Sequence, residues 1–213
     1  MILKPIAILL LLLHFFLRIT LSQPSILIDL ILFNLVGVLA AVIALTAPLV
    51  TDRKAAIAIG YAQLIWSFGS IFSTWNSFFQ LQIPDAIAEV CYAIFYPLVF
   101  IAVTRSFTQK RSMSALEVLD TVIIAVGLTS VLTAFVLKPA MVGLDGSAWQ
   151  VFISILYPVG DIVLLSMVLV YLLLNPLSRR SIFLGLGLLS FATSDLFFIW
   201  GSLSATYEFG AIT

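Results

Sequence analysis

Two aspartates stand in the middle of long apolar runs. Asp161 lies near the centre of the run 149–174, and Asp195 lies somewhat past the centre of the run 182–203. A charged side chain costs about 2.5–3.5 kcal/mol in the hydrocarbon core of a membrane, even on the lenient insertion scale. No Lys, Arg or His lies at the same depth to pair with either carboxyl group. The pair is therefore a candidate proton-responsive or cation-binding site, and the alternative is two protonated carboxyl groups that hold neighbouring helices together.

A short repeat supplies further candidates. The pattern Ile-Phe-Tyr-Pro-Leu, with Tyr96 and Pro97, recurs as Ile-Leu-Tyr-Pro-Val, with Tyr157 and Pro158. A proline inside a helix removes one backbone hydrogen bond, so we expect a kink at each copy. Two kinks at matching depth indicate either a ligand cavity or a packing notch kept after duplication. The predicted ligand- or proton-responsive residues are Asp161, Asp195, Tyr157, Tyr96 and Ser194, with Thr193 as a neighbour.

Other kinds of chemistry are excluded by residue types. Cys91 is the one cysteine and His14 the one histidine, so neither a cysteine-based nor a multi-histidine metal site can form. The sequence contains no phosphate-binding loop, no nucleophile elbow, no zinc-protease motif and no dinucleotide-binding glycine motif. We therefore expect no catalytic residue, no metal and no cofactor in this chain.

Composition places these residues in a membrane protein. The 213 residues are 62% hydrophobic and 9% charged, with a mean hydropathy of +1.22, whereas soluble domains carry about 25% charged residues. A soluble enzyme, a nucleic-acid-binding protein and a disordered tail are excluded. Runs of about 20 apolar residues without period-two alternation predict membrane-spanning helices. The sequence predicts a single integral membrane domain that covers residues 1–213 and has an all-α fold. We expect this domain to be a polytopic transmembrane bundle of about seven spans: 2–21, 26–50, 55–79, 84–104, 116–137, 149–174 and 182–203.

Basic residues predict the orientation of the bundle. With a cytoplasmic N-terminus, eight of the ten Lys and Arg residues fall on the inside, and only Arg18 and Lys138 fall outside. Seven spans then put the C-terminal residues outside. Acidic residues near span ends, such as Asp29, are expected to lie within reach of water. The first span can also be interpreted as a cleaved signal peptide, which would leave the other six spans in the same orientation.

A series of local patterns resembles a known family. In chain order they are Trp-Ser-Phe-Gly at 66–69, Ile-Pro-Asp at 83–85, the Tyr96 repeat, Leu-Asp-Thr-Val-Ile at 119–123, Leu-Tyr-Pro-Val-Gly-Asp at 156–161 and Thr-Ser-Asp-Leu-Phe-Phe at 193–198. From about Ala55 onward, this order resembles the N-terminal multi-span membrane region of bacterial GGDEF/EAL proteins, which make or degrade cyclic di-GMP. The Tyr-Pro-x-Gly-Asp segment is its most specific part.

The resemblance implies a sensory and signal-transducing module in the bacterial inner membrane. Neither a GGDEF nor an EAL signature is present, so cyclic di-GMP turnover would belong to a further domain. Because that domain would be cytoplasmic, we expect the chain to be the front part of a longer protein with at least one more span. Expected partners are the lipid bilayer and a small molecule or proton, with no nucleic acid, and a homodimer is left open.

Two other function classes stay open. The segment from Gly160, together with the segment from Phe183, is similar to part of the lysoplasmalogenase-like membrane hydrolases. In that case Asp161 and Asp195 would be a general acid/base pair. A small ion-coupled carrier is the third interpretation, because the chain has a repeat and acidic residues at the midplane.

Overall fold

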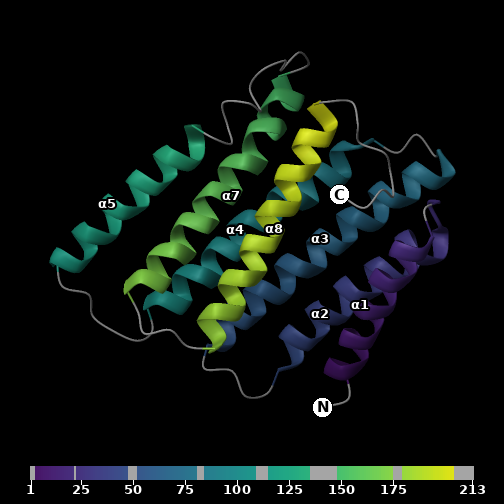
Figure 1. Ribbon diagram of the computed structural model, residues 1–213, viewed down its shortest axis with the longest axis horizontal. Helices are drawn as coiled ribbons and strands as arrows, with labels where there is room; N and C mark the ends of the chain where they lie inside the picture. Colours follow the sequence, from purple (N-terminus) through teal and green to yellow (C-terminus); the bar gives the residue numbers. More distant parts are fainter. Residues whose placement is uncertain are drawn as a thin grey trace. The chain divides into compact units, whose positions relative to one another are not determined.

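All secondary structure in the described residues is helical. A computed structural model describes residues 3–21, 23–47, 52–80, 84–108, 115–134, 148–174 and 179–203, and no strand occurs among them. The all-α fold class is thereby confirmed. Figure 1 shows the helices α1 (Leu3–Thr20), η1 (Ile26–Leu32), α2 (Phe33–Thr46), α3 (Arg53–Phe79), α4 (Ala86–Thr108), α5 (Ala115–Leu132), α7 (Ala148–Leu174) and α8 (Arg179–Leu203).

Each predicted span coincides with a described helix, and the ends differ by a few residues. The second span corresponds to η1 followed by α2, which ends at Thr46 and not at the predicted position 50. Helix α3 begins earlier than predicted because Asp52 caps it: its Oδ1 accepts from Lys54 N at 2.9 Å and from Ala55 N at 3.2 Å. At the other end, Gln80 has a left-handed backbone with φ of 49° and donates its N–H to Asn76 O.

Among the described residues, five helical segments are long and apolar enough to cross a membrane. They are Leu3–Thr20, Ile26–Thr46, Arg53–Phe79, Ala86–Arg105 and Val151–Val170. Large apolar side chains are exposed along these helices, most densely on α1, where Leu9, Phe16 and Ile19 are among them. Exposed apolar faces are typical of helices that contact lipid. The passage of α5 and α8 through a membrane, and the direction of the bundle, stay predictions.

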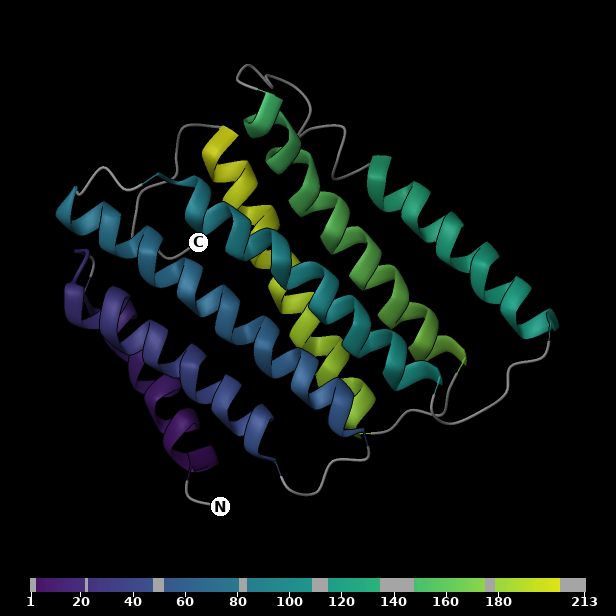
Figure 2. The ribbon, with the colours of Figure 1, turned by 180° about the vertical axis from the view of Figure 1, so that it is seen from behind.

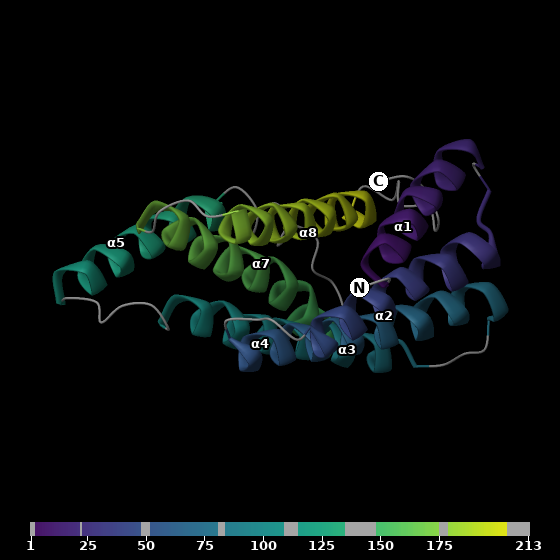
Figure 3. The same ribbon diagram turned by 90° about the horizontal axis from the view of Figure 1, so that it is seen from below.

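The chain divides into two compact units, the first with the described residues up to Ala102 and the second with those from Val103 onward. In the first unit, α1 packs along α2, as Figure 3 shows from below, and α2 packs along α3. Small residues allow close approach: a Cβ atom on Gly60 would meet the side chain of Leu45 at 2.5 Å, and one on Gly69 would meet Cys91 Cβ at 2.8 Å.

Aromatic rings link α1, α2, α3 and α4 in the first unit. His14 of α1 lies 5.5 Å from Phe33 of α2, measured between ring centroids, and Phe33 lies 5.9 Å from Trp66 of α3. Trp66 in turn lies 5.9 Å from Tyr92 of α4. These separations are within the range of favourable aromatic pairs, so the rings stabilise the packing of α1 to α4.

The second unit is built around α7. Figures 1 and 2 show α5 and α8 on either side of this helix, and both pack against it. Thr129 of α5 and Ser166 of α7 share a hydrogen bond of 3.1 Å between their hydroxyl groups. Buried Ile162, Leu164 and Val168 make α7 the core of this unit.

Candidate functional site

Asp161 is the one charged residue of α7, and the helix buries it. Its side chain is 3% exposed, and its Oδ2 atom is enclosed by protein. It lies among buried apolar residues that include Ile162 and Leu164. Burial in apolar surroundings disfavours the charged form of a carboxyl group. Asp161 is therefore a polar side chain enclosed within the packed core of the second unit.

Helix packing brings Asp161 and Asp195 to the same level. A Cβ atom on Gly185 of α8 would lie 3.1 Å from Leu172 Cδ1 and 3.4 Å from Val168 Cγ1 of α7. Because the two helices are antiparallel neighbours, moving forward from Gly185 to Asp195 corresponds to moving back along α7 to the turn that contains Asp161. Asp161 also lies about two helical turns before Val168, on the side of α7 that faces α8.

Asp195 belongs to the packed stripe of α8. The stripe contains Gly185, Leu188 and Ala192, which are buried, and then Asp195, which is half-buried. Their alternating spacing of three and four residues is that of one helix face. The two aspartates predicted as a pair thus lie on neighbouring helices, and the register at Gly185 indicates that they are at a similar level.

The other predicted residues have different surroundings. Tyr157 is half-buried one turn before Asp161 on α7, so both side chains lie on one side of that helix. Ser194 is exposed on α8 and lines a shallow surface depression of about 380 Å³ with Leu189, Ser190, Thr193 and Phe197. Thr193 donates its hydroxyl to Leu189 O at 2.7 Å. The hydroxyl residues of this segment therefore lie beside the packed stripe and not within it.

Tyr96 is buried in α4 and belongs to the first unit. Its ring contacts that of Phe95 edge-on, with 5.6 Å between the centroids. Since the other four candidates belong to the second unit, a shared site with Tyr96 stays a prediction. Tyr96 is therefore a core residue of the first unit.

The two prolines of the repeat differ in environment. Helix α4 continues through Pro97, and α7 continues through Pro158. Pro158 is fully buried, whereas Pro97 is exposed. The two copies of the Tyr-Pro repeat are therefore similar in sequence but differ in how their prolines pack. The kinks expected at Pro97 and Pro158 stay predictions.

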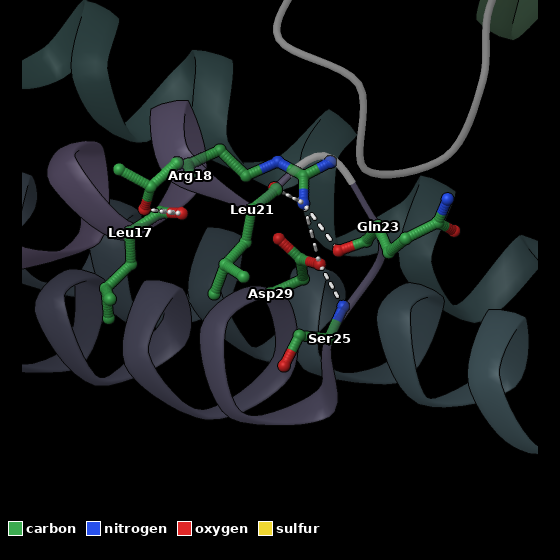
Figure 4. A network of polar contacts seen from close by, with 7 residues as sticks. Leu17, Arg18, Leu21, Gln23, Ser25 and Asp29 are labelled. Carbon is green, nitrogen blue, oxygen red and sulfur yellow. Dashed lines mark hydrogen bonds and ion pairs between the residues drawn. The ribbon is translucent and has the colours of Figure 1, made fainter.

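A buried ion pair is the feature that sequence reasoning missed (Figure 4). Arg18 Nη1 of α1 lies 3.6 Å from Asp29 Oδ2 of η1, with the side chains 9% and 11% exposed. The same Nη1 donates to Gln23 O at 3.2 Å and to Leu21 O at 3.5 Å. Asp29 Oδ2 also accepts from Ser25 N at 2.8 Å. Asp29 is thus more enclosed than expected for an acidic residue near the end of a span.

The polar network shapes the turn between α1 and α2. Arg18 satisfies carbonyl groups just after the end of α1, and Asp29 fixes the start of η1, which is a π-helix. A signal was present in the sequence: opposite charges stand on either side of Gln23-Pro24-Ser25, a polar turn between two apolar runs. A basic and an acidic residue flanking such a turn can meet across it.

Comparisons with known proteins return no relative. No protein-family model, no curated protein and no solved structure matches the chain. Among the described residues, no group of three or more His, Cys, Asp or Glu side chains is placed to hold a metal ion.

Proposed function

We propose that the chain is a membrane sensory and signal-transducing module whose responsive element is the α7–α8 pair. The observation that carries the proposal is the burial of Asp161, 3% exposed, on a helix that packs against α8, the helix that carries Asp195. Intramembrane carboxyl groups are costly and commonly mark ion or proton pathways and sensing elements. The sequence resemblance to the membrane region of GGDEF/EAL proteins supports the same function.

The proposed mechanism is a change in the packing of α8 against α7. When both carboxyl groups are protonated, they can hydrogen-bond within the helix pair. Loss of a proton or arrival of a cation changes the charge in this apolar environment, so the pair must separate, hydrate or hold the cation. Because close contacts at Gly185 set the approach of the helices, the displacement would extend along α8.

The output in this proposal lies outside the chain. A cytoplasmic GGDEF or EAL domain would receive the displacement and change cyclic di-GMP turnover, and the bundle would lie in the bacterial inner membrane. Sequencing the DNA downstream of the codon for Thr213 tests this part. A continuing reading frame with another span and such a domain supports it, and a stop codon at this point contradicts it.

The site is tested by charge-removing substitutions in the protein encoded by the whole reading frame. We expect Asp161→Asn and Asp195→Asn each to change the cellular cyclic di-GMP level, because neither amide can release a proton. Asp120→Asn is the matched control, since Asp120 is an exposed carboxyl group on α5, and it should signal like the wild type. Immunoblots of the membrane fraction check that all three variants insert normally.

Two results would contradict the proposal. If both aspartate variants insert and signal like the wild type, the carboxyl groups serve only to hold the helices together. If the purified protein cleaves alkenyl-ether lysolipids, or drives ion-coupled uptake into proteoliposomes, the hydrolase or the carrier interpretation replaces the sensor.

A further inference from the structure

Two polar atoms are buried in the interface between α2 and α3. Asn34 of α2 is 4% exposed and Ser67 of α3 is 1% exposed. Within the part of the chain that the structure describes, Asn34 Oδ1 and Ser67 Oγ have no hydrogen-bond partner. Buried polar atoms in proteins are nearly always satisfied by protein or by ordered water, most stringently in a membrane. The two atoms therefore point to a ligand that can hydrogen-bond.

The packing register places the two atoms close together. A Cβ atom on Gly37 would lie 2.5 Å from Ser67 Oγ and 3.3 Å from Gln63 Nε2. Asn34 precedes Gly37 by about one turn on α2, so both residues face α3. A Cβ atom on Gly60 would lie 3.3 Å from Ala41 O, which fixes the antiparallel register. This register brings Asn34 within about one turn of Ser67.

Local structure fixes the orientation of the Asn34 amide. Its Nδ2 donates to Leu30 O at 2.8 Å, a carbonyl of the π-helix η1 one turn earlier in the chain. With Nδ2 engaged there, Oδ1 is the atom of the amide that remains available to a ligand. On the Ser67 side, access to the hydroxyl is open because the neighbouring residue of α2, Gly37, has no side chain to cover it.

We propose that an ordered water molecule bridges α2 and α3 between Asn34 Oδ1 and Ser67 Oγ. Two acceptor oxygens and the amide donor of Gln63 supply three partners, which is the usual number for a buried water. Water fits this set because it donates to both oxygens and accepts from Gln63. A cation does not fit, because the site contains a donor and no carboxylate. The site belongs to the first unit and is independent of the Asp161–Asp195 proposal.

Nuclear magnetic resonance of the full chain in deuterated detergent tests the proposal. The sequence has only three asparagines, at 34, 76 and 175, so ¹⁵N-asparagine labelling resolves their side-chain amides. We expect a rotating-frame Overhauser cross-peak, opposite in sign to chemical exchange, between the Asn34 amide protons and water. Its absence in the wild-type protein overturns the proposal, and this measurement requires no variant.

Two substitutions test whether the water molecule is bound to Ser67. Ser67→Ala should abolish the Asn34–water cross-peak, because the water loses one of its partners. Ser77→Ala is the matched control, since this exposed serine of α3 donates to Ser73 O at 2.9 Å and should leave the cross-peak unchanged. A cross-peak that survives Ser67→Ala, or one that disappears equally in both variants, overturns the assignment to this site.

Discussion

At the residue scale, few polar side chains are buried in the described part of the chain, and a buried polar group is costly unless it finds a hydrogen-bond partner. Arg18 and Asp29 compensate each other and also bond backbone groups of the turn. Asp161 is placed differently, because it is the one charged residue of α7 and is buried in the core of the second unit. The first arrangement stabilises a turn, whereas the second encloses a carboxyl group within the helix core and is the basis of the proposed response to a proton or cation.

The ion pair gives a prediction for stability. Arg18→Met should lower the free energy of unfolding by about 3 kcal/mol, because it leaves a carboxylate buried without its cation. The double variant Arg18→Met/Asp29→Leu should lose less than the sum of the two single variants, since no lone charge remains buried. Denaturant titration in detergent micelles, followed by tryptophan fluorescence, measures all three values.

Arg53→Met is the control for this prediction. Arg53 is exposed and donates to the carbonyl groups of Leu45 and Ala47 at another helix end. Its loss should cost no more than about 1 kcal/mol, as for other exposed charged groups. Equal effects at Arg18 and Arg53 would show that the Arg18–Asp29 pair adds nothing beyond the bonds to carbonyl groups.

At the element scale, glycines determine how closely α3 and α4 approach. A Cβ atom on Gly69 would lie 2.8 Å from Cys91 Cβ and 3.1 Å from Ala88 O, both parts of a rigid helix. Gly69→Ala should therefore force the helices apart and cost about 1–3 kcal/mol. Gly187→Ala on α8 meets nothing within 4 Å, so it should be neutral or stabilise the helix by up to about 1 kcal/mol.

The same denaturant titration distinguishes these two variants. Because both replace a helical glycine by alanine, the difference between them reports the close packing at Gly69 and not helix propensity. A Gly69→Ala protein as stable as Gly187→Ala would contradict the close approach of α3 and α4.

The sequence predicts the helices of this fold well and their contacts poorly. Apolar runs give the positions of the helices because about 20 residues are needed to cross hydrocarbon. The π-helical turn at Ile26–Leu32 leaves hydropathy unchanged, so no apolar pattern predicts it. The burial of Asn34 and Ser67 likewise depends on which faces of α2 and α3 meet. For Asp161, by contrast, the central position in an apolar run was enough to select it as a candidate, and the residue is buried.

At the scale of the whole molecule, the distribution of basic residues predicts which end of each helix is cytoplasmic. Eight of the ten lysines and arginines lie in segments that share one side if all seven helices cross the membrane. Positive charge near helix ends sets orientation because those segments resist translocation. The prediction depends on α5 and α8 being spans, in addition to the five segments with sufficient length and apolarity.

Reporter fusions in a bacterial host test this topology. Alkaline phosphatase fused after Leu203 should be active, because seven crossings place this end outside, and green fluorescent protein at the same point should be dark. Fusions after Arg111 should give the opposite pair of results, since four crossings return the chain to the cytoplasm. If only five helices cross and α5 and α8 do not, the fusion after Arg111 keeps its result. In that case the fusion after Leu203 also keeps its result, but a fusion within 175–178 reports the outside, opposite to Arg111, because α7 is then the one crossing between them. With seven crossings the same fusion reports the cytoplasm, because both α5 and α7 cross between Arg111 and 175–178. Comparison of the three fusion sites therefore decides how many helices span the membrane.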